Sequence, residues 1–148
     1  MKALEAAVAS DSPAHAYLFF GPEHVGRATA ARRLAQALNC TGATPPCGEC
    51  EQCIRIERGI HADVLTVGIE AVSEGPGRKN ISEDQVDDVV SAVQFSAYEG
   101  RTRAVIFDPA HALSESAQNK LLLTLEEPPP HVVFVLIASD EEKLLETI

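Results

Sequence analysis

The chain has 148 residues, enough for one domain with a single buried core, and its 45% hydrophobic content argues against disorder. Its 22 acidic and 12 basic residues give a formal net charge of −10, so direct binding of nucleic-acid phosphates through clustered Lys and Arg is not expected. No stretch has the pattern of a signal peptide or the length of a membrane span, and we expect a cytoplasmic protein without membrane contact.

Short apolar runs alternate with stretches of helical periodicity, which is the order of a parallel sheet built from strand and helix units. Most of these runs are continuously hydrophobic, as strands covered on both faces are. The predicted strands are residues 17–20, 64–67, 104–107 and 132–138. We therefore expect an α/β fold in one domain, with no internal repeat or linker.

Two helices are predicted from apolar residues at helical spacing, and the second has a clear start. Ser82 and Gln85 have the spacing of a capping box, and Ile81 with Val86 has that of a hydrophobic staple. The periodic positions are Ala31, Leu34, Ala35 and Leu38 in the first helix, and Val86, Val89, Val90, Val93 and Ala97 in the second.

A third helix is predicted over residues 115–127, with Ser114 as its N-cap. Its apolar side consists of Leu121, Leu122 and Leu125. Pro128 must end it, because proline lacks the backbone donor that would continue the helix. Residues 70–80 combine glycine, proline and charges, and are predicted to form an exposed loop.

The stretch GPEHVGRAT, residues 21–29, follows the first strand and precedes the first helix, where a phosphate-binding loop belongs. Gly21 and Gly26 have the Walker A spacing, but Arg27 and Ala28 stand where that loop has Lys and Ser or Thr. Arg27 keeps a positive charge, whereas Ala28 has no hydroxyl to coordinate Mg²⁺. Two interpretations stay open: a degenerate nucleotide-binding loop, and a connecting turn that never contacts nucleotide.

The end of the third strand carries Asp108, where an NTPase has a carboxylate that holds the metal ion. Pro109 follows at the position where an AAA+ ATPase has the glutamate that activates water, and a proline side chain cannot accept a proton. Glu115 and Glu126 are interpreted as solvated or capping charges. Ser139 is either a sensor-like residue or an ordinary strand end. Together with Ala28, Pro109 predicts a domain without catalytic residues of its own.

All four cysteines fall within 14 residues of sequence, residues 40–53. They are Cys40, Cys47, Cys50 and Cys53. Short spacings with Gly48 suit four thiolates around a tetrahedral, structural Zn²⁺, and a closed shell leaves no open position for catalysis. An iron–sulfur cluster is the main rival, although here the fourth cysteine precedes the triple and no proline follows it. Free or disulfide-bonded cysteines are a further alternative, and His61 is a spare candidate ligand.

Several stretches together cover nearly the whole chain: HAYLFFGP, the four-cysteine module, HADVLTV and LSESAQNKLLLTLEEPPPHVVFVLIAS. They resemble the bacterial DNA polymerase III clamp-loader subunits, which belong to the AAA+ group. The resemblance implies a P-loop NTPase (AAA+, RecA-like) parallel sheet, with a zinc module inserted after the first helix. Arg27, Ala28 and Pro109 resemble the degenerate delta-prime type and not the gamma or tau motor type.

The resemblance to delta-prime implies a subunit that does not hydrolyse ATP. It implies partners in a hetero-oligomeric ring, namely gamma/tau and delta subunits, and through that complex the sliding clamp and primed DNA. The degenerate nucleotide site would consist of Gly21, Gly26, Arg27 and Asp108, and whether it binds ATP stays open.

In that family a Ser-Arg-Cys motif offers an arginine finger to the neighbouring subunit, and it is expected beyond Ile148. Residues 1–148 are therefore expected to be an AAA+ domain that is incomplete at its C-terminus, includes the zinc module at residues 40–53, and lacks the family's lid and collar domains. The alternatives are an ATP-binding gamma or tau motor, a small P-loop kinase, and a zinc-based nucleic-acid adaptor, which the acidic charge disfavours.

Overall fold

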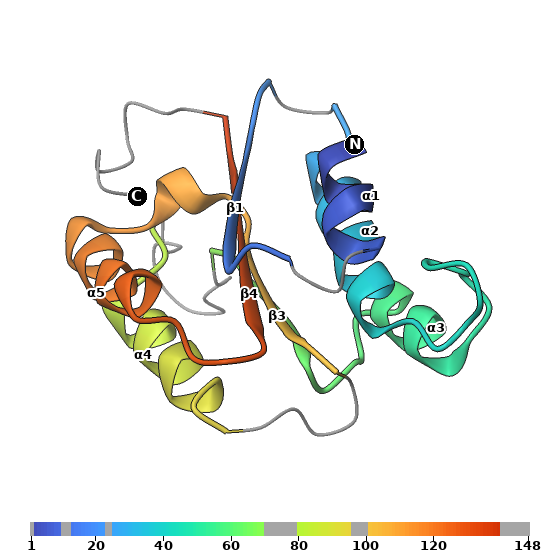
Figure 1. Ribbon diagram of the computed structural model, residues 1–148. Helices are drawn as coiled ribbons and strands as arrows, with labels where there is room; N and C mark the ends of the chain where they lie inside the picture. The colour runs from blue at the N-terminus through green and yellow to red at the C-terminus, as the bar shows by residue number, and fades with distance from the viewer. Residues whose placement is uncertain (1, 10–12, 23–24, 70–79, 96–100, 140–148) are drawn as a thin grey trace.

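The computed structural model describes residues 2–9, 13–22, 25–69, 80–95 and 101–139. They form a four-stranded parallel sheet with helices on both faces (Figure 1). In chain order the elements are α1 (Lys2–Ala9), β1 (Ala16–Phe20), α2 (Arg27–Asn39), α3 (Glu51–Glu57), β2 (Val64–Val67), α4 (Glu83–Ala92), β3 (Arg103–Phe107), η1 (Ala110–Ala112), α5 (Glu115–Glu126) and β4 (Val132–Ala138).

The strand order is β1-β4-β3-β2, so β4 and β3 are central and β1 and β2 are the edges. Ala138 at the end of β4 is level with Phe20 of β1, and Leu136 with Phe107 of β3. Because all four strands are parallel, their carboxyl ends meet at one edge of the sheet, where ligands bind in open α/β folds. Gly21, Asp108 and Ser139 follow three of these strand ends directly.

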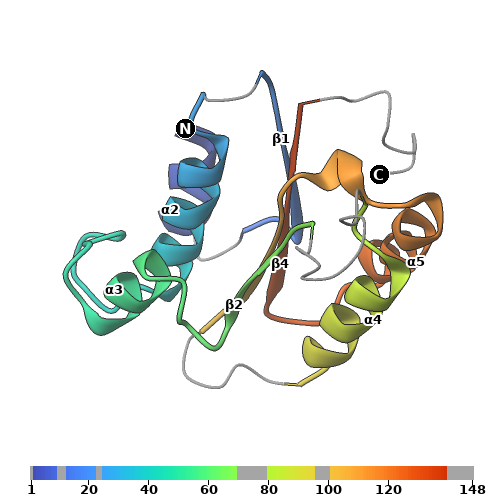
Figure 2. The same cartoon turned by 180° about the vertical axis from the view of Figure 1, so that it is seen from behind.

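Helices α1, α2 and α3 lie on one side of the sheet and α4 and α5 on the other, as Figures 1 and 2 show from opposite directions. The larger apolar core lies under α4 and α5 and includes Phe107, Phe134 and Leu121, each with no exposed surface. A second core forms where Ala31, Leu34 and Leu38 of α2 pack against the central strands. Both faces of the central strands β3 and β4 are thus covered, which the apolar runs predicted.

The predicted strands are present, with small differences in extent and in burial. β2 and β4 have the predicted bounds, whereas β1 and β3 each begin one residue earlier, at Ala16 and Arg103. Every residue of β3 and β4 is buried. Leu18 and Phe20 of β1 are 43% and 53% exposed, so the expectation of two covered faces is wrong for this strand. The reason is its place at the sheet edge, which hydrophobicity alone does not reveal.

Helix α4 starts as predicted. The Ser82 Oγ accepts the Gln85 N–H at 3.3 Å, and the Gln85 Oε1 accepts the Ser82 N–H at 3.0 Å, which completes the capping box. The helix ends at Ala92, so the predicted helical spacing extended too far: Val93 is the C-cap. The predicted position Ala97 lies outside the described residues.

Helix α5 is likewise capped as predicted, since the Ser114 Oγ accepts the Ala117 N–H at 3.2 Å. It ends at Glu126, one residue before the predicted end, and Glu127 is the C-cap. Of the predicted loop 70–80, residues 70–79 lie outside the described residues.

Three short elements were not expected from the sequence: α1, α3 and η1. The N-cap of α3 is Cys50, whose Sγ accepts the Cys53 N–H at 3.4 Å. Helix N-caps are usually Ser, Thr, Asp or Asn, so a cysteine at this position did not indicate the start of a helix.

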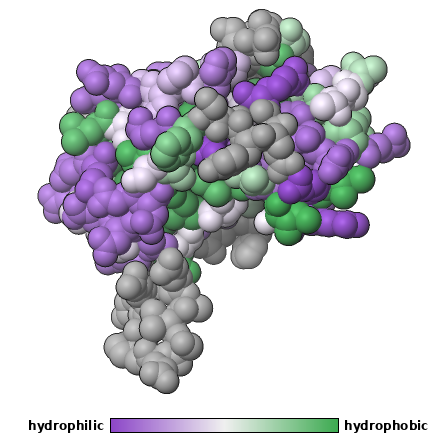
Figure 3. Space-filling view, turned by 90° about the horizontal axis from the view of Figure 1, so that it is seen from below, coloured by the Kyte–Doolittle hydropathy of each residue, from purple (hydrophilic) through white to green (hydrophobic). Residues whose placement is uncertain are grey.

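The surface is strongly polar on the α4 side, as Figure 3 shows from below. Helix α4 contributes the exposed residues Glu83, Asp84 and Asp88. Among the described helices, none combines the length and apolar character that a membrane span requires.

Candidate functional site

The glycine loop joins β1 to α2 at the carboxyl edge of the sheet. The Gly21 N–H donates to the Ala138 carbonyl at 3.2 Å, which ties the loop to the end of β4. Gly26 has a φ of 86°, in the left-handed region that favours glycine, and its carbonyl accepts the first helical bond, from the Ala30 N–H at 2.9 Å. The chain therefore turns sharply into α2, with the first N–H groups of the helix directed out of its end.

A cavity of about 560 Å³ opens at this helix end. Its described lining comes from the start of α2 and from the ends of β3 and β4: Gly26, Arg27, Ala28, Thr29, Asp108, Pro109, His111, Ile137 and Ser139. The structure thus brings together Gly26, Arg27 and Asp108, three of the four residues predicted for a nucleotide site. Gly21 lies at the start of the loop and is not part of this lining.

The cavity lies where a phosphate-binding loop would hold nucleotide, but it has few of the functional groups of an NTPase site. Asp108 is the single carboxylate among the described lining residues. Ala28 and Pro109, at the positions of the metal-binding hydroxyl and of the catalytic base, offer neither an oxygen ligand nor a proton acceptor. Glu115 and Glu126 are exposed on α5 and do not line the cavity, in agreement with their interpretation as solvated charges.

Arg27 has a side chain that the described structure leaves partly unsatisfied. Its Nη1 is buried, and no hydrogen-bond partner is present in the part of the chain that the structure describes. Its Cδ would lie 4.0 Å from a Cβ built on Gly21, so the aliphatic stem passes close to the loop. A buried guanidinium nitrogen without a partner costs free energy, and an anion that accepted its hydrogen would relieve that cost.

His111 is a lining residue that sequence reasoning missed. Its Nδ1 accepts the Ser139 N–H at 3.3 Å, across 28 residues of sequence. The imidazole therefore holds the end of β4 in place. No short motif contains both residues, so only the fold reveals the contact.

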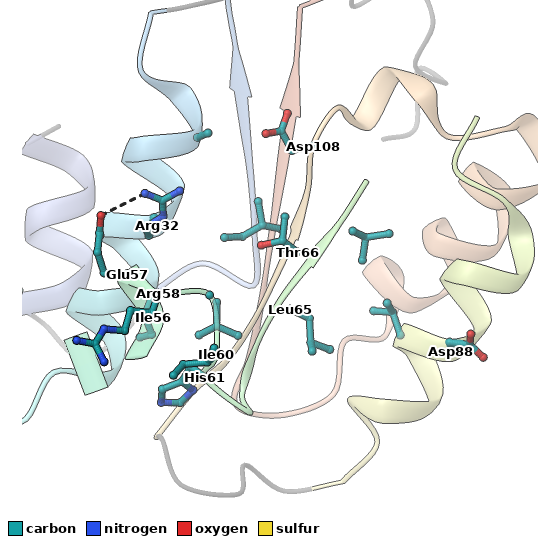
Figure 4. Close-up of a pocket in the computed structure, with 16 residues that line it drawn as sticks. Arg32, Ile56, Glu57, Arg58, Ile60, His61, Leu65, Thr66, Asp88 and Asp108 are labelled. Atoms are coloured by element: carbon teal, nitrogen blue, oxygen red, sulfur yellow. Dashed lines mark hydrogen bonds and ion pairs between the residues drawn. The ribbon is translucent and has the colours of Figure 1, made fainter. Parts of the chain in front are cut away.

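A second cavity, of about 850 Å³, runs beside β2 and shares Ala28 and Asp108 with the first (Figure 4). Arg32 and Glu57 form an ion pair at its rim, with 3.4 Å between the Nη1 and the Oε1. Both side chains are about half exposed, so water screens the pair and it contributes little to stability. Asp108 thus lines both cavities.

The four cysteines lie at the opposite end of α2. Cys40 is the C-cap of α2 and Cys50 the N-cap of α3. All four Sγ atoms lie within 4.8 Å of one another, Cys40 and Cys53 buried, Cys47 and Cys50 half-buried. No two of them form a disulfide, because all four cysteines are free. The predicted gathering of four thiols is therefore present.

The spacing of the sulfurs suits a single metal ion. The Cys40 and Cys50 Sγ atoms are 3.9 Å apart. Four thiolates bound to one Zn²⁺ at about 2.3 Å would be about 3.8 Å apart at the corners of a tetrahedron. An iron–sulfur cluster would need to place several metal and sulfide atoms between the thiolates, which a group this compact does not accommodate. The residues therefore fit zinc better than the rival cluster.

Backbone N–H groups surround the sulfurs. The Cys47 Sγ accepts the N–H groups of Cys50 at 3.2 Å and of Glu49 at 3.4 Å, and the Cys40 Sγ accepts those of Gly42 at 3.3 Å and of Cys47 at 3.4 Å. Such bonds favour the thiolate, which is the form that binds metal.

The thiol pKa values follow this geometry. The hydrogen bond from the Cys53 backbone is the main cause that lowers the pKa of Cys50 to about 5. The pKa of Cys47 is also lowered, mainly by the bond from the Glu49 backbone. Burial raises the pKa of Cys53 to about 12. A metal ion would therefore have to displace a proton from Cys53, whereas Cys50 already offers a thiolate.

Gly42 is a second residue that sequence reasoning overlooked. A Cβ on Gly42 would lie 2.9 Å from both the Cβ and the Sγ of Cys47, so only glycine fits there. Its position two residues after Cys40 was a visible signal, since tight loops between ligands favour glycine.

His61 is not a fifth candidate ligand. Its Nδ1 accepts the Asp63 N–H at 3.1 Å, and its Nε2 contacts the Gln52 Oε1. Because both ring nitrogens have partners, the prediction of His61 as a spare ligand is wrong. The contact with Gln52 instead ties α3 to the start of β2.

A family model described as DNA polymerase III, delta subunit, matches residues 1–148. The tau subunit of DNA polymerase III from Salmonella typhimurium is 40% identical over 136 residues, which are 90% of this chain. The chain spans only 20% of that relative's length.

Two solved structures show the same fold. A DNA polymerase III gamma subunit-related protein from Thermotoga maritima has a TM-score of 0.69 and 22% identity, over 99% of this chain and 42% of its own. The RuvB Holliday junction branch migration motor of the same organism has a TM-score of 0.56 and 15% identity, over 99% of this chain and 38% of its own. The predicted parallel sheet flanked by helices matches the fold of these neighbours. The family match over the whole sequence shows that the chain belongs to the family described as DNA polymerase III, delta subunit.

Proposed function

We propose that this chain is the AAA+ domain of a delta-prime-type clamp-loader subunit, which does not hydrolyse ATP itself. The observation that carries the proposal is the cavity at the start of α2, where Arg27, Ala28 and Pro109 stand together. Ala28 and Pro109 each remove a functional group of an active NTPase, whereas Arg27 replaces its lysine and keeps the positive charge. One loss could be a variant of an active enzyme, but two in one cavity leave no complete route to hydrolysis.

The chemistry of phosphoryl transfer explains why the losses matter. Mg²⁺ is held by oxygen ligands, and Asp108 is the one carboxylate among the described lining residues, with no hydroxyl at Ala28 to share the ion. A water molecule at the γ-phosphate needs a group to orient it or accept its proton, and Pro109 has none. Arg27 can still attract a phosphate anion, although the site lacks the groups that would hydrolyse it.

We propose a structural Zn²⁺ for the four cysteines, with the module 40–53 as part of a domain that spans residues 1–148. Four thiolates leave no open position on the metal, so its contribution would be to hold a loop that has few apolar contacts of its own. The partners proposed for the assembled protein are gamma/tau and delta subunits in a ring, with the sliding clamp and primed DNA as the targets of the whole complex.

The second candidate function is an ATP-binding gamma or tau motor. The 40% identity to a tau subunit favours it, as do the retained glycine loop and Asp108. The two candidates differ in one measurable property, Mg²⁺-dependent nucleotide binding, since a motor must bind ATP with its metal.

The test compares the natural chain with a triple variant, Arg27→Lys, Ala28→Thr and Pro109→Glu, by calorimetric titration with ATP in the presence and absence of Mg²⁺. The proposal expects no Mg²⁺-dependent binding by the natural chain and a gain of such binding in the triple variant. Thr29→Ala, which changes a neighbouring hydroxyl of the same cavity, is the matched control. Tight Mg²⁺-dependent binding by the natural chain, abolished by Asp108→Ala, would favour the motor instead.

A further inference from the structure

Helix α2 and strand β3 each extend from the cavity to the four cysteines. α2 starts at Arg27 in the cavity and ends at Asn39, next to Cys40. β3 begins at Arg103, at the other end of the sheet. It ends at Phe107, next to Asp108 in the cavity. Figure 2 shows α2 beside the sheet with α3 at its far end. α2, which begins at Arg27, and the chain that leads into β3 therefore lie close together near the candidate metal ligands.

A buried amide joins them at that end. The Asn39 side chain is only 1% exposed, and its Oδ1 accepts the N–H groups of Arg101 at 2.9 Å and Thr102 at 3.0 Å. Its Nδ2 donates back to the Ala35 carbonyl at 3.2 Å. One side chain at the end of α2 thus satisfies the two backbone donors that lead into β3.

Arg101 extends this junction to the cysteines. Its Nη2 donates to the Cys40 carbonyl at 2.9 Å, across 61 residues of sequence. On the other side of the cysteines, the Gln36 side chain, 1% exposed, donates from Nε2 to the Cys53 carbonyl at 2.9 Å. Both buried cysteines therefore have their backbone held by side chains of the domain.

The half-buried cysteines are held differently. The Cys47 and Cys50 sulfurs accept N–H groups from within residues 49–53, and no side chain outside the module is bonded to their carbonyls among the described contacts. Cys40 and Cys53 are thus fixed to the domain through their carbonyls, Cys50 is fixed to the start of α3, and Cys47 is fixed to the loop. A metal ion that binds all four would connect the loop to the junction of α2 and β3.

We propose that Gln36, Asn39 and Arg101 are positioning residues that couple the four-cysteine centre to the junction of α2 and β3, so that metal binding sets how firmly these two elements are joined. This inference rests on the proposed zinc site and goes beyond it, because a purely local metal would stabilise residues 40–57 alone. Mutation of groups that orient metal ligands commonly weakens metal binding by about ten- to a hundredfold.

The first test is hydrogen exchange on the full chain, with zinc bound and after removal by a chelator under reducing conditions. Bound zinc is first counted by elemental analysis. Coupling predicts that zinc removal speeds amide exchange at least about tenfold in residues 36–39 and 101–104, as well as in the loop. Faster exchange confined to residues 40–57 would overturn the inference and leave the zinc proposal standing. Absence of zinc from reduced protein would overturn both.

The second test uses Co²⁺ as a spectroscopic probe of the same site, in competition with a chelator. Arg101→Ala is expected to weaken Co²⁺ binding about tenfold, and Arg101→Lys, which keeps a donor, to recover most of that loss. Arg33→Ala, an exposed arginine on α2, is the matched control and should bind Co²⁺ as the natural chain does. Equal affinity of Arg101→Ala and the natural chain would contradict a positioning role. Neither test measures ATP, so failure here is distinct from failure of the proposed delta-prime function.

Discussion

The two ends of helix α2 differ in which functional groups are present. At its start, the cavity retains the loop, a helix end and Asp108, but the hydroxyl and the base of an NTPase are replaced by Ala28 and Pro109. At its end, all four sulfurs needed for a tetrahedral metal site lie within 4.8 Å of one another. Under the proposed function, the groups for catalysis are missing at one end of α2 while the four cysteines at its other end are all present, because the two sites depend on different residues.

The largest expected effect comes from removing the metal. We expect chelation under reducing conditions to lower the melting temperature by about 10 °C. A metal ion at about a thousand times its dissociation constant adds about 4 kcal/mol to the free energy of unfolding. Each kcal/mol shifts the melting temperature of a domain of this size by about 2–4 °C. Differential scanning calorimetry measures it, with added zinc as the reversal control. An unchanged melting temperature in protein shown to have lost its metal would contradict a structural role.

The next largest effect concerns thiol reactivity in metal-free protein. With its pKa lowered to about 5, Cys50 is a thiolate at neutral pH, whereas burial raises the pKa of Cys53 to about 12 and keeps it protonated. We expect iodoacetamide to modify Cys50 about a hundredfold faster than Cys53, after allowance for the weaker nucleophilicity of a low-pKa thiolate.

The pH dependence of this reaction has a definite sign. The Cys50 rate should stay level as the pH falls from 9 and should drop only below about 5, where the thiolate takes up a proton. Peptide mapping by mass spectrometry follows each site, and zinc-loaded protein should be protected. A Cys50 rate that already halves near pH 8.5, as for an ordinary thiol, would show that the backbone donors do not act as described.

A smaller effect separates substitutions at the two ends of α2. Asn39→Ala leaves the backbone donors of Arg101 and Thr102 without their buried acceptor and should cost about 1–3 kcal/mol of unfolding free energy. Arg27→Ala removes a buried nitrogen that has no partner among the described residues, so it should leave the free energy of unfolding unchanged or raise it. Urea unfolding of both variants tests the pair. A larger loss for Arg27→Ala than for Asn39→Ala would reverse the comparison.

Much of the fold could be predicted because its signals are local. The apolar runs of β2 and β4, the capping box of Ser82 and Gln85, and the cap at Ser114 each depend on residues within a few positions of one another. The cysteines were likewise expected to meet, since their short spacings restrict where the sulfurs can lie.

The rest could not be predicted because it depends on contacts between distant segments. The exposure of Leu18 and Phe20 follows from the place of β1 at the sheet edge. The bond of His111 to Ser139 and that of Asn39 to Arg101 join residues 28 and 62 positions apart. The start of the short helix α3 could not be predicted because its N-cap is a cysteine, whose sulfur takes the place of the usual oxygen acceptor.

The most direct test of the central claim, that the cavity at the start of α2 does not perform hydrolysis, is steady-state release of phosphate from ATP with Mg²⁺, measured beside the Asp108→Ala variant. We predict equal, background rates for the natural chain and the variant, because Ala28 and Pro109 already lack the required groups. Turnover by the natural chain that Asp108→Ala abolishes would contradict this account.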